Sequence, residues 1–213
     1  MHYRGIFGGT FDPIHAGHLA LALYSVEKLG LDTLAIMPCH IPPHRQQPGV
    51  TAEHRAAMVQ LAIAPYPALY LETLELERHT ASYSVDSLSL LKQKYPEDTL
   101  LFFIGMDSLQ NFTRWHRWQD ILQLANLVVW QRPGYDTNNP ECQQLLIDYP
   151  AAMPATAQPA ADYFSKDAGQ ILLLDNPQYA ISATQIRADQ RLQQLPAVAA
   201  YIAKHQLYRS SHV

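Results

Sequence analysis

The chain has 213 residues, of which 48% are hydrophobic and 16% are charged, and its net charge is −4. This composition supports a buried core, excludes a disordered chain and argues against a binder of duplex nucleic acid. Because the 2 cysteines lie far apart and neither a signal peptide nor a membrane-spanning apolar run is present, we expect a cytoplasmic protein with no nucleic-acid or membrane partner.

Strand-like and helix-like runs alternate along the first half of the chain. Apolar residues recur at helical spacing up to Gly30, a residue that suits a helix C-terminus, and Thr51 and Ser84 stand where side chains cap helix starts. The predicted strands are Tyr3–Phe7, Thr33–Met37, Ala68–Glu72 and Thr99–Ile104, and the predicted helices are Gly17–Leu29, 51 to about 64, and 84 to about 94.

The second half continues this alternation after one interruption. Residues 133–169 are rich in Pro, Ala, Asn and Gln, and we expect a surface excursion or flap there, within a single domain over residues 1–213. The predicted strands are Leu127–Gln131 and Ile171–Leu174, and the predicted helices are Gln119–Ala125, Glu141–Tyr149, Ser182–Gln190, which Ser182 caps, and Pro196–His205. Alternating strands and helices predict an α/β protein with a doubly wound parallel sheet, whose ligands bind at the carboxyl ends of the strands.

The motif GGTFDPIHAGH at residues 8–18 joins the first predicted strand to a helix start. A helix N-terminus attracts phosphate, and Gly8 and Gly9 let a phosphate approach the backbone closely. His15 and His18 add donors that titrate near pH 7. The pair could instead bind a metal or cap the helix, but the glycines favour contact with a nucleotide phosphate.

A second motif, ISATQIR at residues 181–187, has a similar chemistry. Ser182 and Thr184 stand at a predicted helix start, and Arg187 follows one turn later on the side of Thr184. A planar guanidinium suits phosphate oxygens, although the segment alone is also typical of a capped surface helix with a solvated arginine.

Two further segments carry candidate contacts to a nucleotide or to an aromatic ring. Asp107, in IGMDSL at residues 104–109, could accept a hydrogen bond from a ribose or could cap the next helix. In FTRWHRW at residues 112–118, Trp115 and Trp118 are expected one helical turn apart. We expect Phe112 and Trp118 in the core and Trp115 stacked on a heteroaromatic ring, where a pyridinium would gain further from the indole face.

The two motifs, in this order, resemble those of the nucleotidyltransferases that carry a T/H-x-G-H motif. The segments PCHIPPHR at 38–45, SYSVDSL at 82–88 and FTRWHRW at 112–118 resemble those of the bacterial nicotinate-mononucleotide adenylyltransferases. The resemblance runs from residue 3 to about residue 208. It implies a Rossmann-like, doubly wound parallel sheet flanked by helices, with a C-terminal helical segment.

The resemblance also implies an activity, which is adenylyl transfer from ATP to nicotinate mononucleotide in NAD biosynthesis, giving deamido-NAD and pyrophosphate. Mg²⁺ would arrive with ATP, and no metal site of the protein's own is expected.

The implied catalytic residues are His15, His18 and Arg187. The implied ATP contacts are Gly8, Gly9, Thr10, Phe11, His15, His18, Gly105, Asp107, Ile181, Ser182, Thr184 and Arg187. The implied nicotinate mononucleotide contacts are His44, Arg45, Tyr83, Ser84, Trp115 and His116.

Departures from the family pattern fall on the pyridine side of the expected site. They are Cys39 with His40, Ser84 and His116, and they leave the choice of pyridine open. Nicotinamide mononucleotide and phosphopantetheine are the alternative acceptors. A nucleotide-sensing module without turnover is the alternative from a different class, and the sequence leaves the oligomeric state open.

Overall fold

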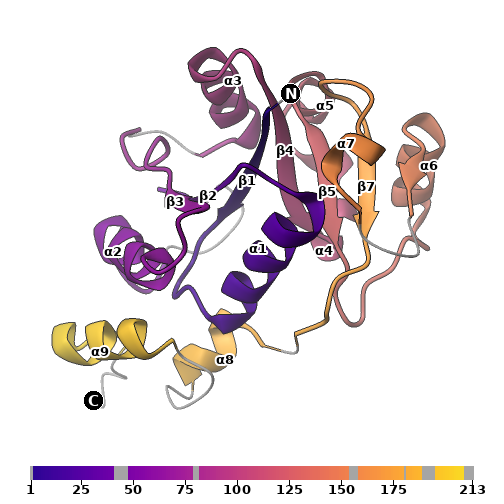
Figure 1. Ribbon diagram of the computed structural model, residues 1–213. Coiled ribbons are helices and arrows are strands. Elements are labelled where there is room, and N and C mark those ends of the chain that lie inside the picture. The colour runs from indigo at the N-terminus through magenta and orange to yellow at the C-terminus, as the bar shows by residue number, and fades with distance from the viewer. Residues whose placement is uncertain are drawn as a thin grey trace.

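A parallel sheet forms the centre of the molecule (Figure 1). The computed structural model describes residues 2–40, 48–78, 82–153, 158–179, 181–188 and 195–208. The described residues form a 7-stranded sheet in the order β3-β2-β1-β4-β5-β7-β6, and every pairing is parallel. The strands are β1 (His2–Gly9), β2 (Thr33–Pro38), β3 (Leu69–Leu71), β4 (Asp98–Gly105), β5 (Asn126–Trp130), β6 (Ala151–Ala152) and β7 (Ile171–Leu174).

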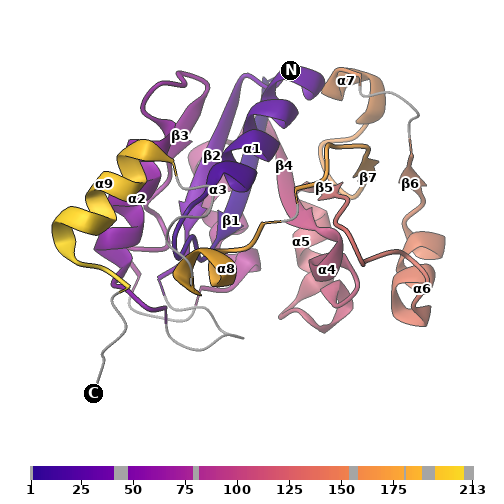
Figure 2. The same ribbon diagram turned by 90° about the horizontal axis from the view of Figure 1, so that it is seen from below.

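Helices cover both faces of the sheet (Figure 2). One hydrophobic cluster joins the sheet to α1 (Ala16–Leu29), α2 (Ala52–Ile63), α7 (Ala160–Tyr163) and α9 (Pro196–His205). The other joins the opposite face to α3 (Ser84–Lys94), α4 (Met106–Leu109), η1 (Phe112–Arg114), α5 (Trp118–Leu124) and α6 (Pro140–Asp148). Along β4, Phe103 belongs to the first cluster and Phe102 to the second, because successive side chains point to opposite faces.

The strand order reverses between β1 and β4. The chain runs from β1 through β2 to β3 on one side, and β4 then returns to pair with β1 on the other side. Ligands of open parallel sheets bind at the carboxyl ends of the strands beside such a reversal. The predicted doubly wound parallel sheet is confirmed, and its reversal point lies where the glycine loop leaves β1.

Most predicted elements form within a residue or two of their expected bounds. The helix end predicted at Gly30 is present, with a left-handed φ of 58°. The side-chain caps expected from Thr51 and Ser84 are both wrong. The Thr51 side chain makes no capping bond to α2, and the N-cap of α3 is Tyr83, so Ser84 is the first helical residue.

Residues 133–169, expected as a surface excursion, contain α6, β6 and α7 where the structure describes them. Strand β6 pairs with β7 and forms one edge of the sheet, so part of this stretch extends the central layer. Strand β6 shows no periodic signal in the sequence because it is only 2 residues long. None of the described helices is long and apolar enough to cross a membrane.

Candidate active site

The histidine pair opens α1, and each ring caps the backbone of the other residue. His18 N donates to His15 Nδ1 at 3.4 Å, and His15 N donates to His18 Nδ1 at 3.3 Å. The rings stack with their centroids 3.6 Å apart. A neutral imidazole that accepts at Nδ1 carries its proton on Nε2, so capping fixes the tautomer. The capping alternative is therefore realised, and it is compatible with a donor role for each Nε2–H.

His15 is neutral near pH 7. Its ring is buried, and burial together with the charge of Arg132 lowers the pKa of His15 to about 4. The expectation that His15 titrates near pH 7 is wrong, because burial disfavours the protonated, charged form of its ring. His15 can therefore act as a neutral hydrogen-bond donor.

Phe11 supports the pair from the glycine loop. It is buried, its φ is 49°, and its ring meets those of Phe7 and His18 edge-on at 5.1 Å and 5.2 Å. The side chain of Phe11 therefore belongs to the core and fixes the position of the His18 ring. The backbone of the loop remains the part that could reach a nucleotide.

The two sequence motifs meet although they come from opposite ends of the chain. Arg187 Nη1, in α8 (Ala183–Ala188), donates to the carbonyl oxygen of Asp12 at 2.7 Å. A Cβ added to Gly17 would lie 2.7 Å from Cγ2 of Ile181, so only glycine fits at the start of α1. The C-terminal motif is thereby held against the glycine loop.

The start of α8 has the geometry that its sequence predicts. Gln185 N donates to Ser182 Oγ at 3.2 Å, and Ser182 N donates to Gln185 Oε1 at 2.9 Å, which is a capping box. Arg187 Nη2 donates to Thr184 Oγ1 at 3.2 Å, so these two side chains share one side of the helix. The cap prediction for Ser182 is confirmed, and Gln185 is the partner that the sequence reasoning missed.

Asp107 lies at the carboxyl end of β4, beside β1 in the sheet. Gly105 is the N-cap of α4, so the alternative role of Asp107 as that cap is wrong. The Asp107 carboxylate instead accepts from Arg132 Nη1 at 3.0 Å. Arg132 was not among the expected site residues. The available signal was its place just beyond the buried strand β5 (Asn126–Trp130), separated from it by Gln131.

The expected acceptor residues are only partly described. Tyr83, at the start of α3, and His116 lie together with their ring centroids 4.6 Å apart. Ser84 contributes its backbone N–H to the first turn of α3. The expected phosphate contacts, His44 and Arg45, lie outside the described residues.

Trp115 and Trp118 do not share one helical turn. Trp115 follows η1, Arg117 takes a left-handed φ of 53°, and Trp118 opens α5, so the expected spacing of one helical turn is wrong. Phe112 is buried as predicted, and the rings of both tryptophans lie against it, at 5.5 Å for Trp115 and 6.0 Å for Trp118. Trp115 and Trp118 are both only half-buried, so the prediction that Trp118 belongs to the core is not confirmed. Part of the Trp115 surface is available for stacking.

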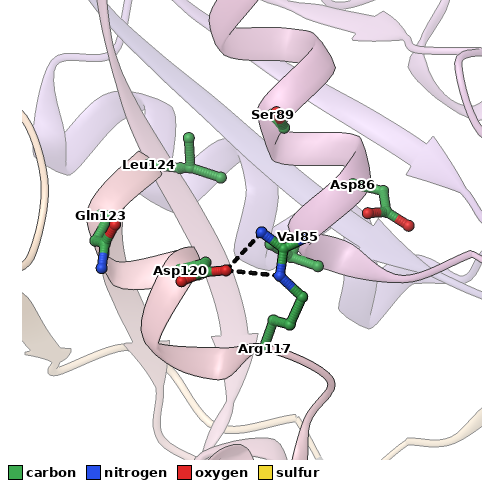
Figure 3. Close-up of a pocket in the computed structure, with 7 residues that line it drawn as sticks. All are labelled: Val85, Asp86, Ser89, Arg117, Asp120, Gln123 and Leu124. Carbon is green, nitrogen blue, oxygen red and sulfur yellow. Dashed lines mark hydrogen bonds and ion pairs between the residues drawn. The ribbon is translucent and has the colours of Figure 1, made fainter.

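A hollow of about 280 Å³ lies between α3 and α5 (Figure 3). Its lining is largely polar, and Arg117 pairs with Asp120 at 2.6 Å across it. The full lining is Val85, Asp86, Ser89, Arg117, Asp120, Gln123 and Leu124. None of the expected site residues lines this hollow, so it is separate from the site at the carboxyl ends of β1 and β4.

The donor set at that edge suits phosphate. Within the described residues, no three His, Cys, Asp or Glu side chains gather to hold a metal ion. The edge instead presents imidazole, guanidinium and helix-start N–H groups, which bind phosphate oxygens.

The sequence matches known proteins over nearly its whole length. A profile of the family described as cytidylyltransferase-like matches residues 6–189. A protein of Cellvibrio japonicus named "Probable nicotinate-nucleotide adenylyltransferase" is 45% identical over 212 residues, covering 96% of this chain and 98% of that protein. A protein of Aeromonas hydrophila with the same name is 42% identical, covering 96% of each chain.

Solved structures agree at the level of the fold. The Plasmodium falciparum nicotinic acid mononucleotide adenylyltransferase complexed with NaAD superposes with a TM-score of 0.73 at 17% identity, covering 98% of each chain. Its complex with APC superposes with a TM-score of 0.70 at 18% identity. The family profile and the two full-length relatives show that this chain belongs to the cytidylyltransferase-like family and, within it, to the nicotinate-nucleotide adenylyltransferases.

Proposed function

We propose that the chain transfers the adenylyl group of ATP to nicotinate mononucleotide, giving deamido-NAD and pyrophosphate in NAD biosynthesis. Full-length relatives at 45% and 42% identity carry the name of this activity. The structural observation that carries the proposal is the 2.7 Å bond from Arg187 Nη1 to the carbonyl oxygen of Asp12. It brings the C-terminal motif onto the glycine loop that precedes the histidine pair.

The reaction is a displacement at phosphorus. An oxygen of the 5′-phosphate of the mononucleotide attacks the α-phosphorus of ATP and forms a new P–O bond. The bond from the α-phosphorus to the bridging oxygen breaks, and pyrophosphate leaves with the electron pair. The protein supplies no nucleophile, so its task is to align two polyanions and to stabilise the charge that develops on the leaving group.

His15 and His18 are the proposed donors to the triphosphate. Their Nδ1 atoms hold the helix start, which orients each Nε2–H as a fixed donor. A preorganised donor stabilises developing charge without having to reorient during the reaction. The neutral state of His15 keeps this arrangement constant through the physiological pH range.

Arg187 is the proposed contact to the outer phosphates of ATP. Its guanidinium donates to the Asp12 carbonyl and to Thr184 Oγ1, which keeps it beside the glycine loop. Mg²⁺ would enter with ATP as part of the substrate and would supply positive charge to the phosphate groups. Arg132, paired with Asp107, adds a second guanidinium at this edge.

The start of α3 is the proposed recognition site for the pyridine carboxylate. Tyr83 caps this helix with its backbone only, and its side chain makes no capping bond, so the first N–H groups of α3 have no side-chain cap among the described residues. Such N–H groups suit a carboxylate. Trp115 is the proposed stacking partner of the ring, and His44 and Arg45 are the proposed contacts to the mononucleotide phosphate.

The test is pyrophosphate release from Mg-ATP with nicotinate mononucleotide, nicotinamide mononucleotide and phosphopantetheine compared side by side. A preference for the nicotinate form of about 10²-fold, or about 2.7 kcal/mol, is expected from a carboxylate site at the start of α3. Equal use of both pyridine nucleotides would contradict that specificity. ATP binding without release with any acceptor would instead support a nucleotide sensor. The proposed location of this activity is the cytoplasm.

A further inference from the structure

A buried arginine that the expected site does not include joins two of the loops that form it. Arg55, in α2, is 1% exposed. Its Nη1 donates to the carbonyl oxygen of Thr10 at 2.7 Å, and its Nη2 donates to the carbonyl oxygen of His40 at 3.1 Å. Thr10 belongs to the glycine loop after β1, and His40 follows β2, directly before the segment that contains His44 and Arg45.

The same connection continues toward the pyridine end of the site. His40 N donates to Oγ of the buried Ser82 at 3.2 Å. Ser82 directly precedes Tyr83, which opens α3. Hydrogen bonds therefore run from the glycine loop through Arg55 and His40 to the proposed carboxylate site, across the ends of β1 and β2.

Packing alone does not account for an arginine at this position. Burying a guanidinium costs free energy, and bonds to two neutral carbonyls return only part of it. Arg55 Nε is also buried without a hydrogen-bond partner among the described residues. A guanidinium, however, bonds the two carbonyl oxygens from two nitrogens held in one plane, whereas an aliphatic side chain has no donor and a lysine has only one nitrogen.

We infer that Arg55 is a positioning residue that couples the binding of the mononucleotide to that of ATP. An acceptor bound at the start of α3 fixes Ser82 and, through it, the His40 backbone, and the Arg55 fork transmits that position to Thr10 in the glycine loop. Such coupling is reciprocal, so ATP strengthens acceptor binding by the same factor. This inference rests on the proposed function and goes beyond it, because it assigns a role to a residue that touches neither substrate.

The experiment measures the dissociation constant of nicotinate mononucleotide with and without saturating α,β-methylene ATP. We expect the analogue to tighten acceptor binding in the wild-type protein by about 5-fold or more. Arg55→Lys keeps the charge but offers its donors from a single nitrogen, so it cannot keep the two carbonyls at the fixed separation of the guanidinium, and we expect its coupling factor to fall close to 1. Ser82→Ala removes the acceptor of the His40 N–H and should lower the coupling factor in the same direction.

Arg4→Lys is the matched control, because Arg4 is also a partly buried guanidinium, bonded to Asp98, Thr33 and Tyr70 at the opposite edge of the sheet. It should retain the wild-type coupling factor even if its stability falls.

Wild-type coupling that persists in both Arg55→Lys and Ser82→Ala, or no coupling in the wild type, would overturn the inference. If Arg55→Lys does not fold, the coupling factor of Ser82→Ala alone decides whether the inference stands. Absence of wild-type turnover with nicotinate mononucleotide would overturn the proposed function, whereas full turnover without coupling would overturn only the coupling.

Discussion

The Nδ1 atoms of His15 and His18 accept hydrogen bonds from the start of α1, so the proposed chemistry falls to their Nε2 atoms. In each histidine, Nδ1 thus holds the helix start and Nε2 is the proposed donor. A substitution can remove one of these roles and keep the other. An asparagine places an acceptor oxygen near the position of Nδ1 and has no atom at the position of Nε2. Substitution by asparagine should therefore keep the cap and lose the donor, whereas substitution by alanine should lose both.

We expect His18→Asn and His18→Ala both to lower kcat for pyrophosphate release by about 10²-fold or more, because each removes one donor to the developing charge. Only His18→Ala also loses the cap, so its free energy of unfolding should fall by about 1 kcal/mol relative to His18→Asn. Steady-state kinetics and denaturant unfolding measure the two effects. A near-normal kcat in His18→Asn would contradict the donor role.

The lowered pKa of His15 predicts how stability depends on pH. Between pH 6.5 and about 4 the unfolded chain binds a proton at this ring and the folded protein does not. The free energy of unfolding should therefore fall as the pH drops through this window, by up to about 3 kcal/mol. An NMR titration of the His15 ring should show its midpoint near pH 4, and His15→Asn should lose this part of the pH dependence. A midpoint near 6.5 would contradict the buried, neutral state.

Trp115→Ala should raise KM for nicotinate mononucleotide roughly tenfold and leave KM for ATP nearly unchanged, because it removes the proposed stacking surface. Trp118→Ala is the control, since the ring of Trp118 lies against Phe112 and Tyr149. It should lower stability without a selective change in either KM. An equal rise in both KM values for Trp115→Ala would place the stacking residue elsewhere.

Among the secondary-structure elements, α1 and the segment that leads into α8 come from distant parts of the chain and meet where Gly17 lies against Ile181. We expect Gly17→Ala to lower the free energy of unfolding by about 1–3 kcal/mol, because its Cβ would press against Ile181 and the His15 ring. Gly8→Ala is the control, since its Cβ would find only ordinary contacts, 3.7 Å from Met37 and 3.8 Å from Phe102. Gly8→Ala should keep wild-type stability and weaken ATP binding. Denaturant unfolding and KM for ATP distinguish the two variants, and wild-type stability in Gly17→Ala would contradict the close contact.

Local sequence signals predicted the longer elements well. The bounds of α3 and α9 agree with the structure because apolar spacing and helix-end residues are encoded within each segment. The short elements α4 and β6 were missed because they contain too few residues to show a period.

The candidate site was predictable only where a motif marks it. The sequence identified the histidines and Arg187 but could not show that Arg132 meets Asp107 or that Arg55 joins two loops. Those contacts depend on which strands lie side by side, and the order β1-β4-β5 is a property of the assembled sheet. The capped state of the histidines likewise depends on ring orientations that spacing alone leaves open.

At the scale of the whole molecule, Asp12 ties the C-terminal segment to the site. Its Oδ1 accepts from Tyr208 Oη at 2.6 Å, its Oδ2 accepts from Gly49 N at 2.8 Å, and its carbonyl accepts from Arg187. Burial is the main cause that raises the pKa of Tyr208, and the hydrogen bond to Asp12 raises it further. The hydroxyl therefore stays protonated and donates. The end of the chain thus helps to hold the loop that orients Arg187.

Tyr208→Phe should therefore lower the free energy of unfolding by about 1.5–3 kcal/mol, the range for a hydrogen bond to a charged group, and should raise KM for ATP several-fold. Tyr201→Phe is the matched control, because the Tyr201 hydroxyl bonds His54 Nδ1 at 3.0 Å between α9 and α2 and does not reach Asp12. It should lose some stability and keep the wild-type KM for ATP. Equal KM values in the two variants would mean that the C-terminal segment stabilises the fold without orienting Arg187. A rise confined to Tyr208→Phe would show that residues 196 positions apart act on one loop.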